Sequence, residues 1–310
     1  MVEAHLGWGD WYFEPTVTIG LVALVAMYVV AMRRGLLRSD DDVSPWFRST
    51  TMRPVCFGLG ILVAVIALLS PIDRGGDRYL FSIHMVQHLL LMMVAPPLAL
   101  LGIAGGQGVR ERAVRVPRSV RVLLGSITRL WPAAIVFATV MLVWHIPALY
   151  NEALTVQPLH VFEHITFVAA GVVFWWPIVD PWRTPASRVI GPLAKVAMLT
   201  VSGIPPTLLG FLFALTPTPL YSFYTIQPRL WGLSPVTDQQ WAGVLMFGAG
   251  NVIYFVAITA IFLRMFEDPE RDEREAQAAG AATRRPARGS PWSCWSCPVA
   301  VRCRRQQAGP

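Results

Sequence analysis

Charged residues are scarce in this chain: they make up 15% of its 310 residues, against 54% hydrophobic residues, and the mean hydropathy is +0.49. A soluble globular domain carries about 25% charged residues. The few charges are crowded together, and long runs between them hold none. This distribution excludes an ordinary soluble domain. It predicts an all-α, polytopic membrane protein, because helices satisfy their own backbone hydrogen bonds in lipid.

Lysine and cysteine are also rare. Lys195 is the single lysine beside 25 arginines, and the four cysteines give no disulfide framework. Three of them, Cys294, Cys297 and Cys303, lie near the C-terminus and lack a fourth ligand for a metal site. Membrane topology accounts for the formal charge of +7, so we expect no nucleic-acid partner.

Seven segments are apolar enough to cross a bilayer core of about 30 Å, which takes roughly 20 residues. They are Thr16–Met32, Met52–Ser70, Tyr79–Gly102, Trp131–Tyr150, His160–Val179, Leu193–Leu215 and Trp241–Leu263. We therefore expect a bundle of seven transmembrane helices over residues 1–266 and a disordered cytoplasmic tail over 267–310. The last segment holds no lysine for a Schiff base, which excludes a retinal protein.

Two proline pairs fall inside these segments. The sequence Ala95-Pro96-Pro97 is expected to bend or end the third span, and Pro205-Pro206 to interrupt the sixth near mid-membrane. In the seventh span, Asn251 and Tyr254 are expected to form hydrogen bonds between helices.

The connections between the spans are alternately rich and poor in basic residues. Those on one side, with the tail, carry 23 lysines and arginines, and those on the other side carry 3. Because basic residues accumulate on the cytoplasmic side of a membrane, the count predicts an N-terminus outside and a C-terminus in the cytoplasm.

Five of the six histidines lie in or beside three successive predicted spans. His84 and His88 are four residues apart in the third span, and His160 and His164 have the same spacing at the start of the fifth. This spacing puts two imidazoles on one helix face, about one turn apart. With His145 in the fourth span, all five fall within roughly 12 Å of the outer boundary. Because ionisable groups inside a bilayer are costly, these five residues predict a metal or haem site.

Methionines accompany the histidines on or at the edge of the same helical faces, so Met85, Met92 and Met141 are auxiliary candidate ligands. Glu163 is a further candidate, as a partner for a ligand imidazole. Imidazole suits zinc, copper, iron and nickel, and added thioether favours Cu(I), so copper is the preferred metal. Histidines facing one another across two helices could also ligate haem, which stays the alternative.

Several motifs surround these residues: HMVQHLLLMMVAPPLALLG (His84–Gly102), WHIPALY (Trp144–Tyr150), LHVFEH (Leu159–His164), FWWPIVDP (Phe174–Pro181) and PLYSFY (Pro219–Tyr224). In these motifs the chain resembles the seven-helix, caa3-type CtaG family of cytochrome c oxidase assembly factors. The resemblance covers about residues 8–266. It implies a multi-pass protein of the bacterial inner (plasma) membrane that takes part in maturation of a haem–copper oxidase.

The resemblance also implies copper handling, with His84, His88, His145, His160 and His164 as the candidate residues. We therefore predict an assembly factor, not an enzyme, that binds copper near the extracytoplasmic face and delivers it to oxidase subunits. A membrane haem protein with a redox role is the second hypothesis, and a metal transporter is the third. The pattern leaves open whether the protein acts as a monomer or a homodimer.

Overall fold

The computed structural model describes residues 6–7, 9–37, 52–104, 117–181 and 190–267. Within these ranges every regular element is a helix. The helices are α1 (Pro15–Arg33), α3 (Met52–Leu69), α4 (Pro71–Arg78), α5 (Phe81–Leu89), η1 (Leu90–Val94), α6 (Ala95–Ile103), α8 (Arg118–Ile127), α9 (Leu130–Trp144), α10 (Pro147–Thr155), α11 (Gln157–Val179), α12 (Pro192–Ser202), α13 (Ile204–Leu215), α14 (Ser222–Thr225) and α15 (Pro235–Glu267). The all-α prediction is therefore confirmed for the part of the chain that the structure describes.

Among the described residues, six helices or runs of adjoining helices are long and apolar enough to cross a membrane. They are Pro15–Arg33, Met52–Leu69, Phe81–Ile103, Gln157–Val179, Pro192–Leu215 and Pro235–Phe266. A seventh span results if α8 and α9, which meet at 81°, are counted as one. This is the helix content of a multi-pass membrane protein.

The chain divides into two compact units, Met1–Phe262 and Leu263–Pro310, and the first unit contains the packed helices. Of the predicted tail over 267–310, Glu267 is the last residue of α15, and residues 268–310 with the three cysteines lie outside the described residues. So do the arginines of the connections over 38–51, 105–116 and 182–189. The predicted orientation therefore stays a prediction.

The fourth predicted span, Trp131–Tyr150, is wrong at its C-terminal end. The helix α9 ends at Trp144, and a second helix, α10, begins at Pro147. Proline has no N–H to continue the ladder of α9 and disfavours helical geometry at the preceding residue. Ile146 is accordingly extended, with φ −65° and ψ 123°. His145 therefore lies in a turn between two helices instead of on the face of one.

The proline pair of the third span does not end it, because α6 continues to Ile103. A five-residue π-helix, η1, precedes the prolines, and the N–H of Ala95 bonds to the carbonyl of Leu90. Pro96 and Pro97 have no N–H to donate, so two carbonyl groups of the preceding turn lack their helical partners. The wider turn of the π-helix accommodates this loss. In the sixth span the break falls at Gly203, so that Pro205 and Pro206 stand in the first turn of α13, where no N–H is required.

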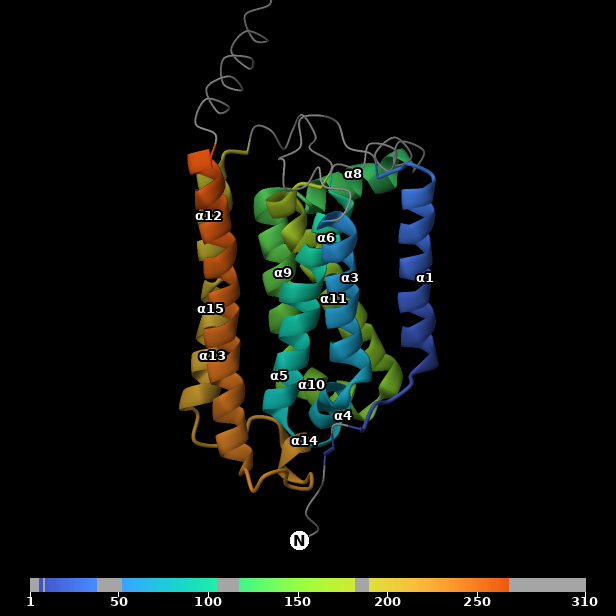
Figure 1. Cartoon of the computed structure of the whole chain (residues 1–310). Coiled ribbons are helices and arrows are strands. Elements are labelled where there is room, and N and C mark those ends of the chain that lie inside the picture. The colour runs from blue at the N-terminus through green and yellow to red at the C-terminus, as the bar shows by residue number, and fades with distance from the viewer. Residues whose placement is uncertain (1–5, 8, 38–51, 105–116, 182–189, 268–310) are drawn as a thin grey trace, which may run out of the picture. The chain divides into compact units, whose positions relative to one another are not determined.

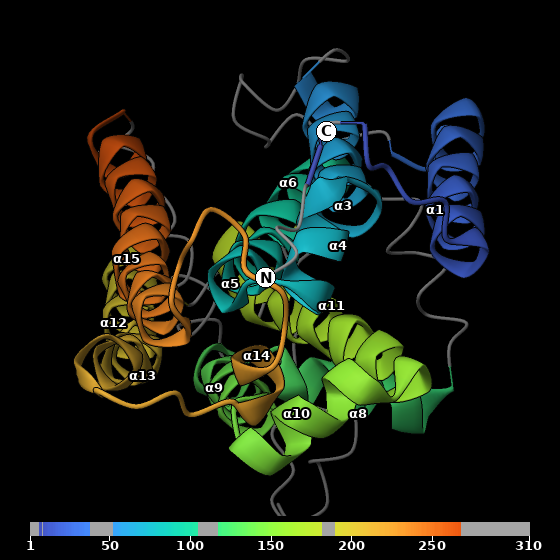
Figure 2. The ribbon, with the colours of Figure 1, turned by 90° about the horizontal axis from the view of Figure 1, so that it is seen from below.

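Helix α11 packs against α9 on one side and against η1 and α6 on another. The approach to η1 is so close that a Cβ at Gly171 would lie 2.5 Å from the carbonyl oxygen of Met92. Helix α3 packs on α6, and α1 packs on α3, as Figures 1 and 2 show. The predicted bonds between helices are confirmed: Asn251 donates to Thr207 at 2.8 Å, and the Tyr254 hydroxyl donates to the carbonyl of Ser202 at 3.4 Å.

Three short helices, α4, α10 and α14, cluster at the end of the bundle where α5 and α11 begin (lower part of Figure 1). Helix α5 starts without a capping side chain of its own, since Leu80 occupies that position. Asp238 of α15 supplies the cap, accepting hydrogen bonds from the backbone N–H groups of Phe81 (2.7 Å) and Ser82 (3.0 Å). A residue 156 positions away thus fixes the start of the helix that carries His84 and His88.

Candidate metal centre

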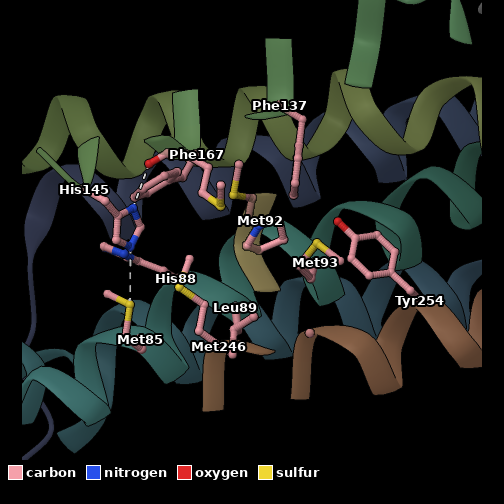
Figure 3. A pocket seen from close by; sticks show the side chains of 13 residues that line it. Met85, His88, Leu89, Met92, Met93, Phe137, His145, Phe167, Met246 and Tyr254 are labelled. Atoms are coloured by element: carbon pink, nitrogen blue, oxygen red, sulfur yellow. Dashed lines mark hydrogen bonds between the residues drawn. The ribbon is translucent and has the colours of Figure 1, made fainter. Parts of the chain in front are cut away.

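A pocket lies between α5, η1, α9, α11, α13 and α15 (Figure 3). Its walls are apolar for the most part and hold five of the 11 methionines of the chain. These are Met85, Met92, Met93, Met141 and Met246. His88 and His145 are the imidazoles in its lining.

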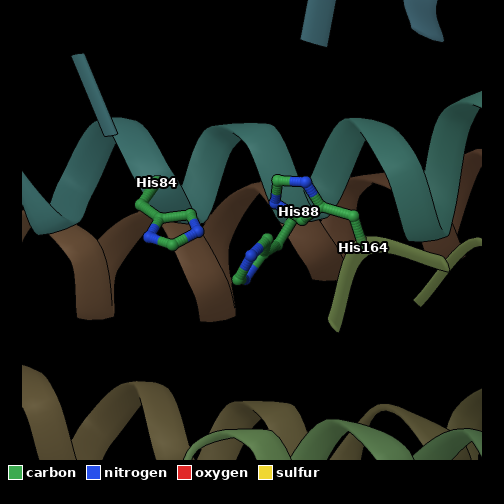
Figure 4. Close-up of side chains that lie close together, drawn as sticks. All are labelled: His84, His88 and His164. Atoms are coloured by element: carbon green, nitrogen blue, oxygen red, sulfur yellow. The ribbon is translucent and has the colours of Figure 1, made fainter. Parts of the chain in front are cut away.

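Four imidazoles converge between α5 and α11. The ring centroids of His84 and His88 are 4.1 Å apart, and those of His160 and His164 are 4.2 Å apart, as the spacing within each helix predicts. Across the two helices, His84 and His160 are 5.4 Å apart and His88 and His164 are 5.6 Å apart. One nitrogen from each of His84, His88 and His164 lies within 4.8 Å of the other two, and Figure 4 shows the three rings together.

Most of these ring nitrogens have no hydrogen-bond partner, although they are buried. Unpartnered atoms gather in the region formed by α4, α5 and α11: Asp77 Oδ1, His84 Nε2, Gln87 Oε1, His88 Nδ1 and Nε2, His160 Nε2, Glu163 Oε1 and Oε2, and His164 Nε2. More than nine in ten buried polar groups in proteins are normally partnered. A cation placed among these atoms would satisfy several of them at once, so the donor set fits a metal ion.

The protonation of His84 follows from its neighbours. Its Nδ1 lies 2.9 Å from the hydroxyls of both Tyr150 and Tyr224. Burial raises the pKa of both tyrosines well above the ordinary value, so both hydroxyls keep their hydrogens. The Tyr224 hydrogen is donated to the carbonyl of Gly76 at 2.8 Å, so this hydroxyl can only accept from His84. The hydrogen is therefore on Nδ1, and the lone pair of Nε2 faces the other imidazoles.

Two carboxylates border the imidazoles. Asp77 Oδ1 lies 3.4 Å from His160 Nε2, and Glu163 Oε1 lies 3.8 Å from His88 Nε2. Asp77, His84 and His160 form a second group whose donor atoms lie within 4.8 Å of one another. Burial, followed by the charges of Asp73 and Glu163, raises the pKa of Asp77 well above its ordinary value. A cation between Asp77 and the imidazoles would favour the ionised carboxylate.

Helix α4 packs closely against α5 beside these imidazoles. A Cβ at Gly76 would lie 2.8 Å from the Cα of His84, so only glycine permits this approach. Gln87 donates to Asp73 at 2.7 Å from the next part of α5. These two contacts hold α4, and with it Asp77, against the imidazoles.

His145 lies beside the four imidazoles, with its ring centroid 6.4 Å from that of His88. Its Nδ1 contacts the carbonyl oxygen of Met141 at 2.7 Å, and its Nε2 lies 3.5 Å from the sulfur of Met85. It is not part of either group whose donor atoms lie within 4.8 Å of one another. Of the predicted ligands, the structure thus brings His84, His88, His160 and His164 together and separates His145 with Met85.

Comparison with known proteins identifies the chain at this point. A family model described as cytochrome c oxidase caa3 assembly factor (Caa3_CtaG) matches residues 26–268. The chain belongs to this family. No curated protein and no solved structure matches it. The match confirms the resemblance predicted from the motifs, and it includes every histidine of the candidate centre.

For this Caa3_CtaG protein, sequence reasoning missed the residues that orient the imidazoles. Asp77 lay in a predicted loop, but Ser70 and Pro71 are a helix-start signature that could have revealed α4. Tyr150 and Tyr224 stood in two of the motifs without an assigned role. Their contact with His84 joins segments 66 and 140 residues away in the chain, for which no local signal exists. Glu163, a candidate partner for a ligand imidazole, is fully buried, and its Oε1 lies 3.8 Å from His88 Nε2.

Proposed function

We propose that this cytochrome c oxidase assembly factor binds copper through His84, His88, His160 and His164 and delivers it to an oxidase subunit. The observation that carries the proposal is the concentration of unpartnered buried donor atoms between α4, α5 and α11. Leaving such atoms without partners is costly, at roughly 1–3 kcal/mol each. A bound cation is the simplest reason for a membrane protein to keep so many in one place.

Donor chemistry supports copper as the ion. Neutral imidazole nitrogen is a ligand for copper, zinc, iron and nickel, and the thioethers next to the imidazoles favour copper among these. The family is one of oxidase assembly factors, and a haem–copper oxidase needs copper to be complete. A single ion fits between three nitrogens that lie within 4.8 Å of one another. A porphyrin between two axial imidazoles would exclude the third ring, so the geometry disfavours haem.

A cargo ion must also leave. Asp77 has 23% of its side chain accessible, while the His160 side chain beside it is 5% accessible. Copper would therefore enter and leave past Asp77, at the end of the bundle where α4, α10 and α14 lie. The predicted orientation, which rests on the count of basic residues, puts this end on the extracytoplasmic side of a bacterial inner membrane. In this orientation the copper would face a partner oxidase subunit without crossing the bilayer, and no catalytic step is required.

The test uses a strain that lacks the gene, grown with limiting copper. Plasmids would supply the wild-type protein, the double variant His84→Ala/His88→Ala, or His5→Ala, which alters the one histidine outside the predicted site. The proposal predicts that the double variant is present in the membrane but restores neither oxidase activity nor the copper content of the purified oxidase. The wild type and His5→Ala restore both. Full restoration by the double variant would contradict the proposal.

A further inference from the structure

The contact between His145 and Met85 has an unusual chemical feature. The Nδ1 of His145 lies 2.7 Å from a backbone carbonyl oxygen, which can only accept a hydrogen bond, so the ring hydrogen is on Nδ1. Burial favours the neutral ring, whose Nε2 then carries a lone pair. This Nε2 lies 3.5 Å from the Met85 sulfur, which also offers only lone pairs. Two electron-pair donors therefore face each other with no hydrogen between them. The dashed line between His145 and Met85 in Figure 3 marks this contact.

Ordinary packing does not account for this geometry. A methionine sulfur beside an aromatic ring commonly lies about 5 Å from it and contacts the hydrogens of the ring edge. Here the sulfur lies against the bare nitrogen instead. Both side chains are buried, at 6% and 2% exposure for His145 and Met85, so water does not separate them.

The separation matches that of two ligands on one metal ion. With metal–nitrogen and metal–sulfur bonds of about 2.0 and 2.3 Å, two ligands 3.5 Å apart subtend an angle of about 109°, the tetrahedral value. Met92 and Met141 line the same pocket, but Met85 is the thioether in contact with His145 Nε2. His88 lines this pocket too and has both ring nitrogens unpartnered. A neutral imidazole has one lone pair, so His88 can contact one ion at a time, either in the four-imidazole group or in the pocket, with its hydrogen on the other ring nitrogen.

We propose that His145 and Met85 form a second, soft metal site that binds Cu(I), with His88 as the residue through which copper passes between the two sites. The four-imidazole group with Asp77 offers nitrogen and oxygen, whereas the second site offers nitrogen and sulfur, which selects the monovalent ion. Transfer is a ligand exchange in which copper stays monovalent, so no electron donor is needed. This inference rests on the proposed function, because it extends the same copper path into the pocket.

The test uses the full-length protein, purified in detergent and labelled with selenomethionine. It is loaded anaerobically with Cu(I), and copper X-ray absorption is measured. The wild type is expected to show selenium bound to copper. Met85→Leu, which nearly conserves volume, is expected to lose this signal and to bind Cu(I) at least about tenfold more weakly. The matched control is Met198→Leu, a fully buried methionine outside the pocket lining, which should retain both.

Divalent copper, loaded separately, distinguishes the two proposals. Loss of selenium ligation in Met85→Leu, with divalent binding intact, supports the soft site. A copper–selenium signal that is absent from the wild type, or that persists in Met85→Leu, overturns the soft site. If divalent copper still binds in that case, the proposed function stands. Selenium ligation with no divalent binding would keep the soft site and overturn the four-imidazole site. Failure of both forms of copper to bind overturns both proposals.

Discussion

The hydroxyl of Tyr224 lies 2.9 Å from Nδ1 of His84 and accepts a hydrogen bond from that nitrogen. Its own hydrogen goes to the carbonyl of Gly76, so the tyrosine acts as an acceptor toward the imidazole. The relationship directs the lone pair of His84 Nε2 toward the other three imidazoles. Partners of this kind, which hold a ligand without touching the metal, commonly tune affinity by 10- to 100-fold.

Tyr224→Phe tests that relationship. The variant frees Nδ1 from one acceptor and leaves the Gly76 carbonyl without its donor, so we expect divalent copper to bind roughly 10-fold more weakly. The free energy of unfolding should fall by about 1–3 kcal/mol. Tyr28→Phe is the matched control, because its hydroxyl donates to the carbonyl of Gly102 on α6, away from the imidazoles. The control should lose stability without losing affinity; equal affinity in Tyr224→Phe and the wild type would refute the orienting role.

Gly76→Ala tests the packing of α4 on α5. The added Cβ would lie 2.8 Å from the backbone of His84, so either helix must shift. We expect a loss of roughly 1–3 kcal/mol in the free energy of unfolding and weaker metal binding. Gly58→Ala on α3 is the control, since its Cβ meets nothing within 4 Å and alanine favours a helix by up to about 1 kcal/mol. Thermal unfolding in detergent compares the two variants, and a Gly76→Ala protein as stable as the wild type would show that the contact is not tight.

Asp73 should make stability depend on pH. The pKa of Asp73 is raised to about 6, and burial is the largest cause. The charge of Glu14 also raises this pKa, whereas the hydrogen bond from Gln87 and the charge of Arg78 lower it. The folded state therefore holds this proton more tightly than the unfolded chain, whose pKa is near 3.8. Stability falls as the pH rises from about 4 to about 6 and stays reduced above that range.

Asp73→Asn removes this charge and keeps an oxygen that accepts from Gln87. The variant should be more stable than the wild type at pH 8, by at most roughly 3 kcal/mol, and should show no gain at pH 4. Melting temperatures in detergent at the two pH values measure the difference. A stabilisation equal at both pH values would show that ionisation of Asp73 is not its source.

Much of this arrangement could be predicted from the sequence, because it depends on local periodicity. The pairs His84–His88 and His160–His164 had to share a helix face, and the apolar runs had to be helices. Sequence spacing could not determine how α5 is rotated and shifted against α11, which decides that one nitrogen from each of His84, His88 and His164 meets the others. That register depends on distant contacts such as Asp238 with the start of α5 and Gly171 with η1.

The predicted place of His145 on a helix face was wrong because the chain turns at this residue. Continuing the fourth span to Tyr150 placed His145 on a helix face level with the other imidazoles. Pro147 ends α9 before that point, and His145 takes the C-cap position, with its Nδ1 against the carbonyl of Met141. A proline two residues after a histidine was the available signal.

Divalent copper bound to purified protein tests the central claim most directly. Wild-type protein, His84→Ala/His88→Ala and His5→Ala would be loaded with Cu(II), desalted and compared by elemental analysis and electron paramagnetic resonance. We predict a nitrogen-ligated copper signal in the wild type and in His5→Ala, and its loss in the double variant. An identical copper content and signal in the double variant would contradict the four-imidazole site.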